Sequence, residues 1–212
     1  MAPVGKSLFR LGMTAQTEND VDSPASDNES QLQMLRQLEL SEENFRAIQK
    51  FCRSRGIIFL STAFDEDSVD FLADLNVSVF KVPSGEITNT PLQELIGAKR
   101  KPVTLSTGMA TLGQIGQAMR CLSQFGWPQI GHLQFVSEYP ADVSKTNLRA
   151  VATLTQCFGV PVGLSDHSLG IEVAIAAVTL GATIVEKHFA SGRSSPGRTI
   201  LLRWNRANSK RL

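Results

Sequence analysis

Short apolar runs that recur at a regular interval constrain the fold of this chain more than any other feature. Successive runs lie about 20–30 residues apart, which is the length of one strand–helix unit. A helical pattern of apolar residues lies between each run and the next, for example Ile115, Met119 and Leu122. The predicted strands cover residues 57–62, 79–83, 103–106, 132–136, 160–164 and 183–188.

Apolar strands that alternate with amphipathic helices predict a parallel sheet covered by helices. An open doubly wound sheet and a (β/α)8 barrel both fit this pattern. Polar residues at the end of every predicted strand favour the barrel, because a barrel gathers all these ends around one opening. We therefore predict an α/β fold of the (β/α)8 TIM-barrel type that is incomplete, with about six of the eight strand–helix units.

Capping residues mark where the predicted helices begin and end. Ser41, followed by two glutamates, predicts a helix that runs to about Arg53. Two sequences are typical of capping boxes: Thr90 to Gln93, with Pro91 at the first helical position, and Thr111 to Gln114. Glycines predict helix ends at positions 56, 126, 159 and 181.

Composition and charge limit which cellular compartment and which classes of binding partner we expect. The net charge of +1 gives no indication of nucleic acid or an acidic membrane as a partner. The three cysteines, Cys52, Cys121 and Cys157, are scattered without C-x-x-C spacing, which predicts reduced thiols in a cytoplasmic protein. The first residues contain no apolar core of signal-peptide length, and no apolar stretch of the sequence is long enough to predict a membrane span.

Charge also divides the chain into three predicted regions. Residues 1–30 are acidic and rich in Ser and Asn, which predicts a disordered or weakly ordered segment. Residues 31–190 carry the strand–helix pattern and predict a partial barrel. Residues 191–212 form a basic tail, which we interpret as a solvated end.

Polar side chains at the predicted strand ends form two candidate sites. His167 and His188 each end an apolar run, and two imidazoles at adjacent strand ends predict a divalent-metal site. The hydroxyl groups, the glycine turn at Gly108 and Lys81 suit a small phosphorylated or carboxylated anion. His132 starts a strand at the opposite end and is interpreted as structural. The other strand-end residues are Thr62, Ser84, Glu86, Ser106, Ser137, Tyr139, Ser165, Asp166, Glu186 and Lys187.

Five motifs in order resemble the sialic acid synthase family, which includes the N-acetylneuraminate, pseudaminic and legionaminic acid synthases. They read FLSTAFD, FKVPSGE, LSTGMAT, GLSDHSLG and EKHF, and the resemblance covers about residues 26–190. The resemblance implies a metal-dependent enzyme with a (β/α)8 barrel. Such an enzyme condenses phosphoenolpyruvate with an N-acylated amino sugar similar to N-acetylmannosamine, and releases phosphate and a nonulosonic (sialic) acid. It further implies a homodimer in the intact family.

The resemblance also assigns roles to individual residues. His167 and His188 would bind the metal, which would be Mn²⁺, with Mg²⁺ or Co²⁺ as alternatives. Phosphoenolpyruvate would contact Thr62, Lys81, Ser84, Ser106 and Ser165. Glu86 would contact the sugar, Tyr139 matches a tyrosine of the site, and Ser137 stands where an asparagine is often found. Lys81, Glu86 and Tyr139 are thus the candidate catalytic residues.

The chain departs from the family pattern at both ends. The opening strands, with a catalytic glutamate and a further lysine, are not recognisable in residues 1–20. After Phe189 only Pro196 and Gly197 remain of an acidic loop, and no antifreeze-like domain follows. We therefore expect a chain that is truncated at both ends. Two alternatives stay open: an inactive fragment that binds only metal or anion, and a Schiff-base aldolase with Lys81 or Lys187 as nucleophile.

Overall fold

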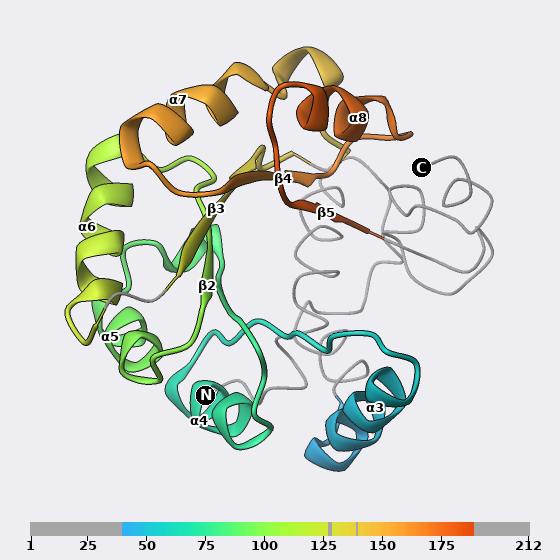
Figure 1. Cartoon of the computed structure of the whole chain (residues 1–212), viewed down its shortest axis with the longest axis vertical. Coiled ribbons are helices and arrows are strands. Elements are labelled where there is room, and N and C mark those ends of the chain that lie inside the picture. The colour runs from blue at the N-terminus through green and yellow to red at the C-terminus, as the bar shows by residue number, and fades with distance from the viewer. Residues whose placement is uncertain (1–39, 127–128, 139, 189–212) are drawn as a thin grey trace, which may run out of the picture. The chain divides into compact units, whose positions relative to one another are not determined.

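The computed structural model describes residues 40–126, 129–138 and 140–188 (Figure 1). These residues fall into two compact units. The first contains the described residues of 40–105 and 110–130, and the second contains those of 106–109 and 131–188. The predicted end segments, 1–30 and 191–212, lie outside the described residues.

The first unit contains four helices and a parallel strand pair. Its helices are α3 (Glu42–Ser54), α4 (Glu66–Asp74), α5 (Thr90–Ala98) and α6 (Leu112–Ser123). Strand β1 (Phe80–Val82) runs parallel to β2 (Val103–Ser106), with Lys81 opposite Thr104, and a short 3-10 turn (Ser84–Glu86) follows β1. Helices α5 and α6 pack closely, because Gly97 lets α5 approach the backbone carbonyl of Leu122.

The second unit contains three parallel strands and two helices. Strands β3 (Ile130–Phe135), β4 (Val162–Asp166) and β5 (Val185–Lys187) pair in parallel, β3 with β4 and β4 with β5. A 3-10 turn (Val143–Lys145) precedes helix α7 (Arg149–Phe158), and α8 (Glu172–Thr179) follows β4. Both α7 and α8 pack against β4 (Figure 1). The central strand β4 is buried along its whole length, as a strand covered by helices should be.

Most predicted elements are confirmed, including the capping box of α6 at Thr111 and the positive-φ glycines that follow the helices. The run 57–62 is different: among the described residues only Thr62 pairs, through an isolated parallel bridge to Lys81. The strand prediction for 57–61 is therefore wrong, and Ile57 and Ile58 are exposed there. The apolar pattern alone does not make a strand, because each strand also needs a neighbour to bond its backbone.

The predicted capping box at Thr90 is also wrong. The cap of α5 is Asn89, whose side-chain oxygen accepts a hydrogen bond from the N–H of Leu92 at 3.3 Å. Gln93 does not reach back to the helix start; its amide donates instead to the carbonyls of Glu86 and Ile87. No helix in the described ranges is long and apolar enough to cross a membrane.

Candidate active site at the strand ends

The ends of β4 and β5 bring two histidines together. The two strands pair so that Ser165 lies opposite Glu186 and Asp166 lies opposite Lys187. His167 and His188 each follow the last strand residue, and their ring centroids are 5.0 Å apart with an interplanar angle of 82°. The two imidazoles therefore lie side by side at the C-terminal ends of two adjacent strands.

A serine connects His167 to an acidic residue on the neighbouring strand. The hydroxyl of Ser165 donates to Glu186 Oε1 at 2.7 Å and lies 3.1 Å from His167 Nε2. A carboxylate can only accept, so the single hydroxyl proton is directed at Glu186. The His167 Nε2–H is then the donor in its contact with Ser165, and a metal bound to that nitrogen would displace this hydrogen bond.

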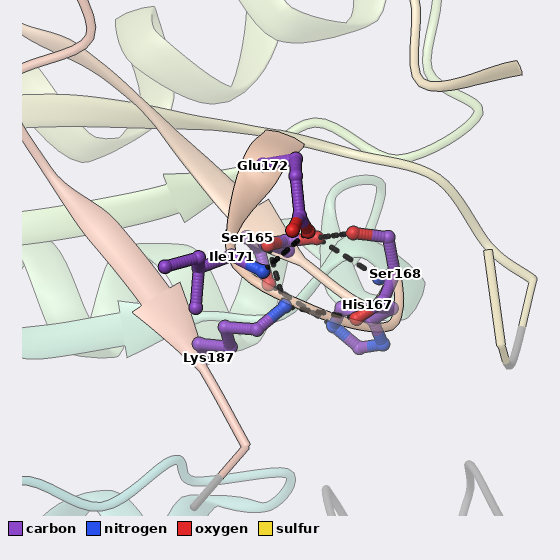
Figure 2. Close-up of polar contacts among 7 residues, drawn as sticks. Ser165, His167, Ser168, Ile171, Glu172 and Lys187 are labelled. Carbon is purple, nitrogen blue, oxygen red and sulfur yellow. Dashed lines mark hydrogen bonds and ion pairs between the residues drawn. The ribbon is translucent and has the colours of Figure 1, made fainter. Parts of the chain in front are cut away.

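Asp166 and Lys187, which directly precede the two histidines in the sequence, form a buried ion pair. Lys187 Nζ lies 2.6 Å from Asp166 Oδ2, and the side chains are 5% and 0% exposed. Lys187 also donates to the carbonyl of Ser168 at 2.8 Å (Figure 2). With Nζ held by these two acceptors, Lys187 is unsuited to the Schiff-base alternative, which needs an amine whose lone pair faces the substrate.

Glu172 lies close to this cluster, at the start of α8 (Figure 2). Its carboxylate accepts hydrogen bonds from its own backbone N–H and from that of Ile171, and both lower the pKa of Glu172. The nearby Lys187 lowers the pKa further. Glu172 thus behaves as an acidic residue at the positive end of a helix.

The first unit carries four of the predicted anion and sugar contacts. Thr62 is buried beside Lys81, which lies half-buried in the middle of β1. Ser84 begins the turn that follows β1, and Glu86 ends it. The Glu86 carboxylate accepts a 2.7 Å hydrogen bond from the Asn89 side chain, which ties this acid to the cap of α5. Ser84 and Glu86 thus lie just beyond the end of β1, while Thr62 and Lys81 pair within the strand region.

The remaining predicted contacts belong to the second unit. Ser106 is buried at the end of β2, and the next residue, Thr107, donates from its backbone and hydroxyl to the Leu133 carbonyl. Ser137 is half-buried, two residues beyond β3. Tyr139 lies outside the described residues. Ser106 and Ser137 therefore also occupy strand ends, as the strand–helix pattern predicts.

The metal-ligand candidates are two imidazoles. Within the described ranges, no group of three or more His, Cys, Asp or Glu side chains is arranged to hold a metal ion. Two neutral imidazoles from adjacent strands can nonetheless bind a divalent ion whose other positions are filled by substrate and water oxygens. The donor chemistry and the ring separation thus fit such an open site.

Glu186 makes a contact that the sequence pattern does not predict. It lies at the end of its strand, and its partner depends on the register between β4 and β5. The spacing in the sequence could have indicated this contact. Glu186 precedes His188 by two positions, as Ser165 precedes His167. Residues two apart on a strand share a face, which places all four on the same side.

A family model described as the NeuB family matches residues 10–212. The N,N'-diacetyllegionaminic acid synthase of Campylobacter jejuni is 42% identical over 174 residues, 81% of this chain and 52% of that protein. The N-acetylneuraminate-9-phosphate synthase of Homo sapiens is 34% identical and is matched over 76% of this chain and 45% of its own length.

The fold is that of the same proteins. The crystal structure of the N-acetylneuraminic acid synthetase from Leptospira borgpetersenii, in complex with citrate, has a TM-score of 0.79 and 25% identity, covering 97% of this chain and 74% of that one. This likeness confirms the predicted incomplete TIM barrel. The chain belongs to the NeuB family. It spans about half the length of the curated relatives that it matches.

Proposed function

We propose that this chain provides part of the active site of an enzyme that condenses phosphoenolpyruvate with an N-acylated amino sugar and releases phosphate. The observation that carries the proposal is the pair of His167 and His188 at the ends of adjacent parallel strands. Support comes from the relatives, which are named as synthases of legionaminic, pseudaminic and N-acetylneuraminic acids or their phosphates. The product would be a nonulosonic acid.

Phosphoenolpyruvate is the proposed ligand of the hydroxyl groups and of Lys81. Hydroxyl and ammonium groups stabilise the charge of a phosphate or carboxylate as it builds up during the reaction. Glu86 is proposed to accept a hydrogen bond from the sugar, with the Asn89 amide holding its carboxylate in place. Ser137 and Tyr139 complete the proposed contacts, together with Thr62, Ser84, Ser106 and Ser165.

His167 and His188 are proposed to hold a divalent ion, Mn²⁺ in the first place and Mg²⁺ or Co²⁺ as alternatives. A bound ion of this kind supplies a Lewis acid that polarises the aldehyde oxygen of the open-chain sugar. In the metal-free chain, Ser165 and Glu186 lie beside His167 and hold its ring by the hydrogen bonds described above.

Manganese titration tests the metal site directly. We expect the purified chain to bind Mn²⁺, measured by electron paramagnetic resonance of the free ion. His167→Ala and His188→Ala should each weaken binding by more than the roughly 10–100-fold that loss of an outer partner of a ligand costs. His132 is the third histidine of the chain, and it is buried in β3. His132→Leu is therefore the matched control and should bind Mn²⁺ as the unmodified chain does. Unchanged affinity in His167→Ala would contradict the proposal.

Borohydride trapping with pyruvate separates the proposal from the aldolase alternative. A Schiff base on Lys81 would be reduced to a stable adduct, seen as a mass increase that Lys81→Arg abolishes. The proposed condensation has no imine intermediate and predicts no adduct. A trapped adduct on Lys81 would replace the proposal by the aldolase.

A further inference from the structure

We propose that the buried ion pair of Asp166 and Lys187 positions the two histidines, an inference that rests on the proposed metal site. Each histidine is the residue that directly follows one member of the pair. The pair also occupies the last register position shared by β4 and β5. The distance between these two side chains therefore sets the distance between the backbone segments that carry His167 and His188.

The contacts of the pair involve Asp166 and Ser168, the residues directly before and after His167. Lys187 Nζ contacts the carboxylate of Asp166 at 2.6 Å and the carbonyl of Ser168 at 2.8 Å. The other carboxylate oxygen of Asp166 accepts from the N–H of Ser168 at 2.9 Å and from its hydroxyl at 2.6 Å (Figure 2). The carbonyl of His167 itself accepts from the N–H of Ala141 at 3.0 Å. Residues 166–168 are thus held as one rigid loop, and Lys187 ties that loop to β5.

Strand alternation places the pair on the face opposite the candidate metal site. Successive side chains of a strand point to opposite faces. Ser165 and Glu186 bond to each other on the face of the His167 ring, so Asp166 and Lys187 lie on the other face. The pair would therefore act through the backbone rather than by contact with an ion held by the two imidazoles, which makes these residues positioning residues rather than catalytic ones.

Stability alone does not explain the pair. Replacing a buried ion pair by apolar residues of similar volume is often neutral or stabilising, because desolvation offsets most of the attraction between the charges. Here both carboxylate oxygens of Asp166 and two N–H groups of Lys187 make contacts that fix residues 166–168. A role in geometry accounts for this arrangement, and outer partners of metal-binding histidines commonly have this effect on affinity.

The first experiment measures Mn²⁺ affinity in Lys187→Met, Asp166→Asn and the double variant. We expect each single variant to bind Mn²⁺ about 10–100-fold more weakly than the unmodified chain. The double variant should be no weaker than the worse single variant, because residues that act as a unit are not additive. Ser168→Ala, which removes only the hydroxyl contact, should lose affinity by a smaller factor and remains informative if the charged variants fold poorly.

A destabilised control separates positioning from general loss of structure. Leu154 is a core residue of α7, 4% exposed. Leu154→Ala should lower the melting temperature without weakening Mn²⁺ binding at low temperature. Equal loss of affinity in Leu154→Ala and Lys187→Met would overturn the inference.

A second readout needs no metal. The chain has three histidines, so their imidazole signals can be resolved and assigned by nuclear magnetic resonance. Lys187→Met should shift the signals of His167 and His188 and leave that of His132 unchanged. If the unmodified chain binds no Mn²⁺, the proposed function fails while this readout still decides the positioning role. If Mn²⁺ binds but both Lys187→Met and Asp166→Asn keep affinity and signals, positioning is wrong and the metal site stands.

Discussion

His132 shows how a single side chain can make the stability of this fold depend on pH. It is fully buried in β3, stacks edge-on against Phe158 at 5.1 Å, and its ring nitrogens have no hydrogen-bond partner among the described residues. Burial lowers the pKa of His132 to about 4, from an ordinary value of 6.5. The imidazole is therefore neutral in the folded protein at neutral pH.

The lowered pKa predicts a loss of stability in acid. Between pH 6.5 and about 4 the unfolded chain binds a proton at this position and the folded chain does not, so stability falls as the pH falls. The slope from this group is at most about 1.4 kcal/mol per pH unit. Urea unfolding at pH 7.5, 6 and 5 should show it, and His132→Leu should flatten the dependence. An equal slope in both proteins would contradict this account.

At the scale of elements, the close approach of β4 and the chain before β5 depends on a glycine. A Cβ at Gly163 would overlap the carbonyl oxygen of Ile184 and come within 2.5 Å of its Cβ. The backbone cannot yield there, since Leu164 donates to that same carbonyl at 2.8 Å. The pairing that aligns Asp166 with Lys187 therefore requires glycine at position 163.

Gly163→Ala should destabilise the protein by about 1–3 kcal/mol, because the strands must separate to admit the methyl group. Gly113, exposed in α6 with an ordinary 3.8 Å contact, is the matched control. Gly113→Ala should be stabilising by about 0.4–1 kcal/mol through the unfolded state. Urea midpoints measure both, and a neutral Gly163→Ala would show that β4 and β5 do not pack this closely.

The start of α5 gives a further test at this scale. Asn89→Ala should cost about 1 kcal/mol of unfolding free energy, because it removes the cap. Thr90→Ala should change stability by less than about 0.5 kcal/mol, since its side chain does not cap the helix. Chemical unfolding of the two variants compares these losses directly. A larger loss in Thr90→Ala than in Asn89→Ala would support the capping box at Thr90 instead.

The sequence predicts elements better than the contacts between them. Five of the six apolar runs become strands because each finds a neighbour, whereas residues 57–61 have an equally apolar sequence and no pairing among the described residues. The Thr90 to Gln93 pattern is valid for a cap, but nothing local shows that Gln93 bonds to two carbonyls outside the helix. Strand ends identify His167 and His188, while the link from Ser165 to Glu186 depends on register.

At the scale of the whole molecule, the proposed function requires this chain to form its part of the site. The described parts fold as two compact units, and each carries strand-end residues of the five family motifs. The first unit holds the proposed Lys81 anion contact, and the second holds the histidine pair. A ligand that engages the folded chain must therefore raise its stability.

Thermal unfolding with and without Mn²⁺ plus phosphoenolpyruvate is the most direct test of the central claim. A ligand that binds only the folded state, at about 100 times its dissociation constant, adds about 2.7 kcal/mol. We predict a cooperative transition whose Tm rises with both ligands present, and a smaller rise in His167→Ala. A chain without a cooperative transition, or an equal rise in His167→Ala, would contradict the claim that the strand ends form a metal-dependent site.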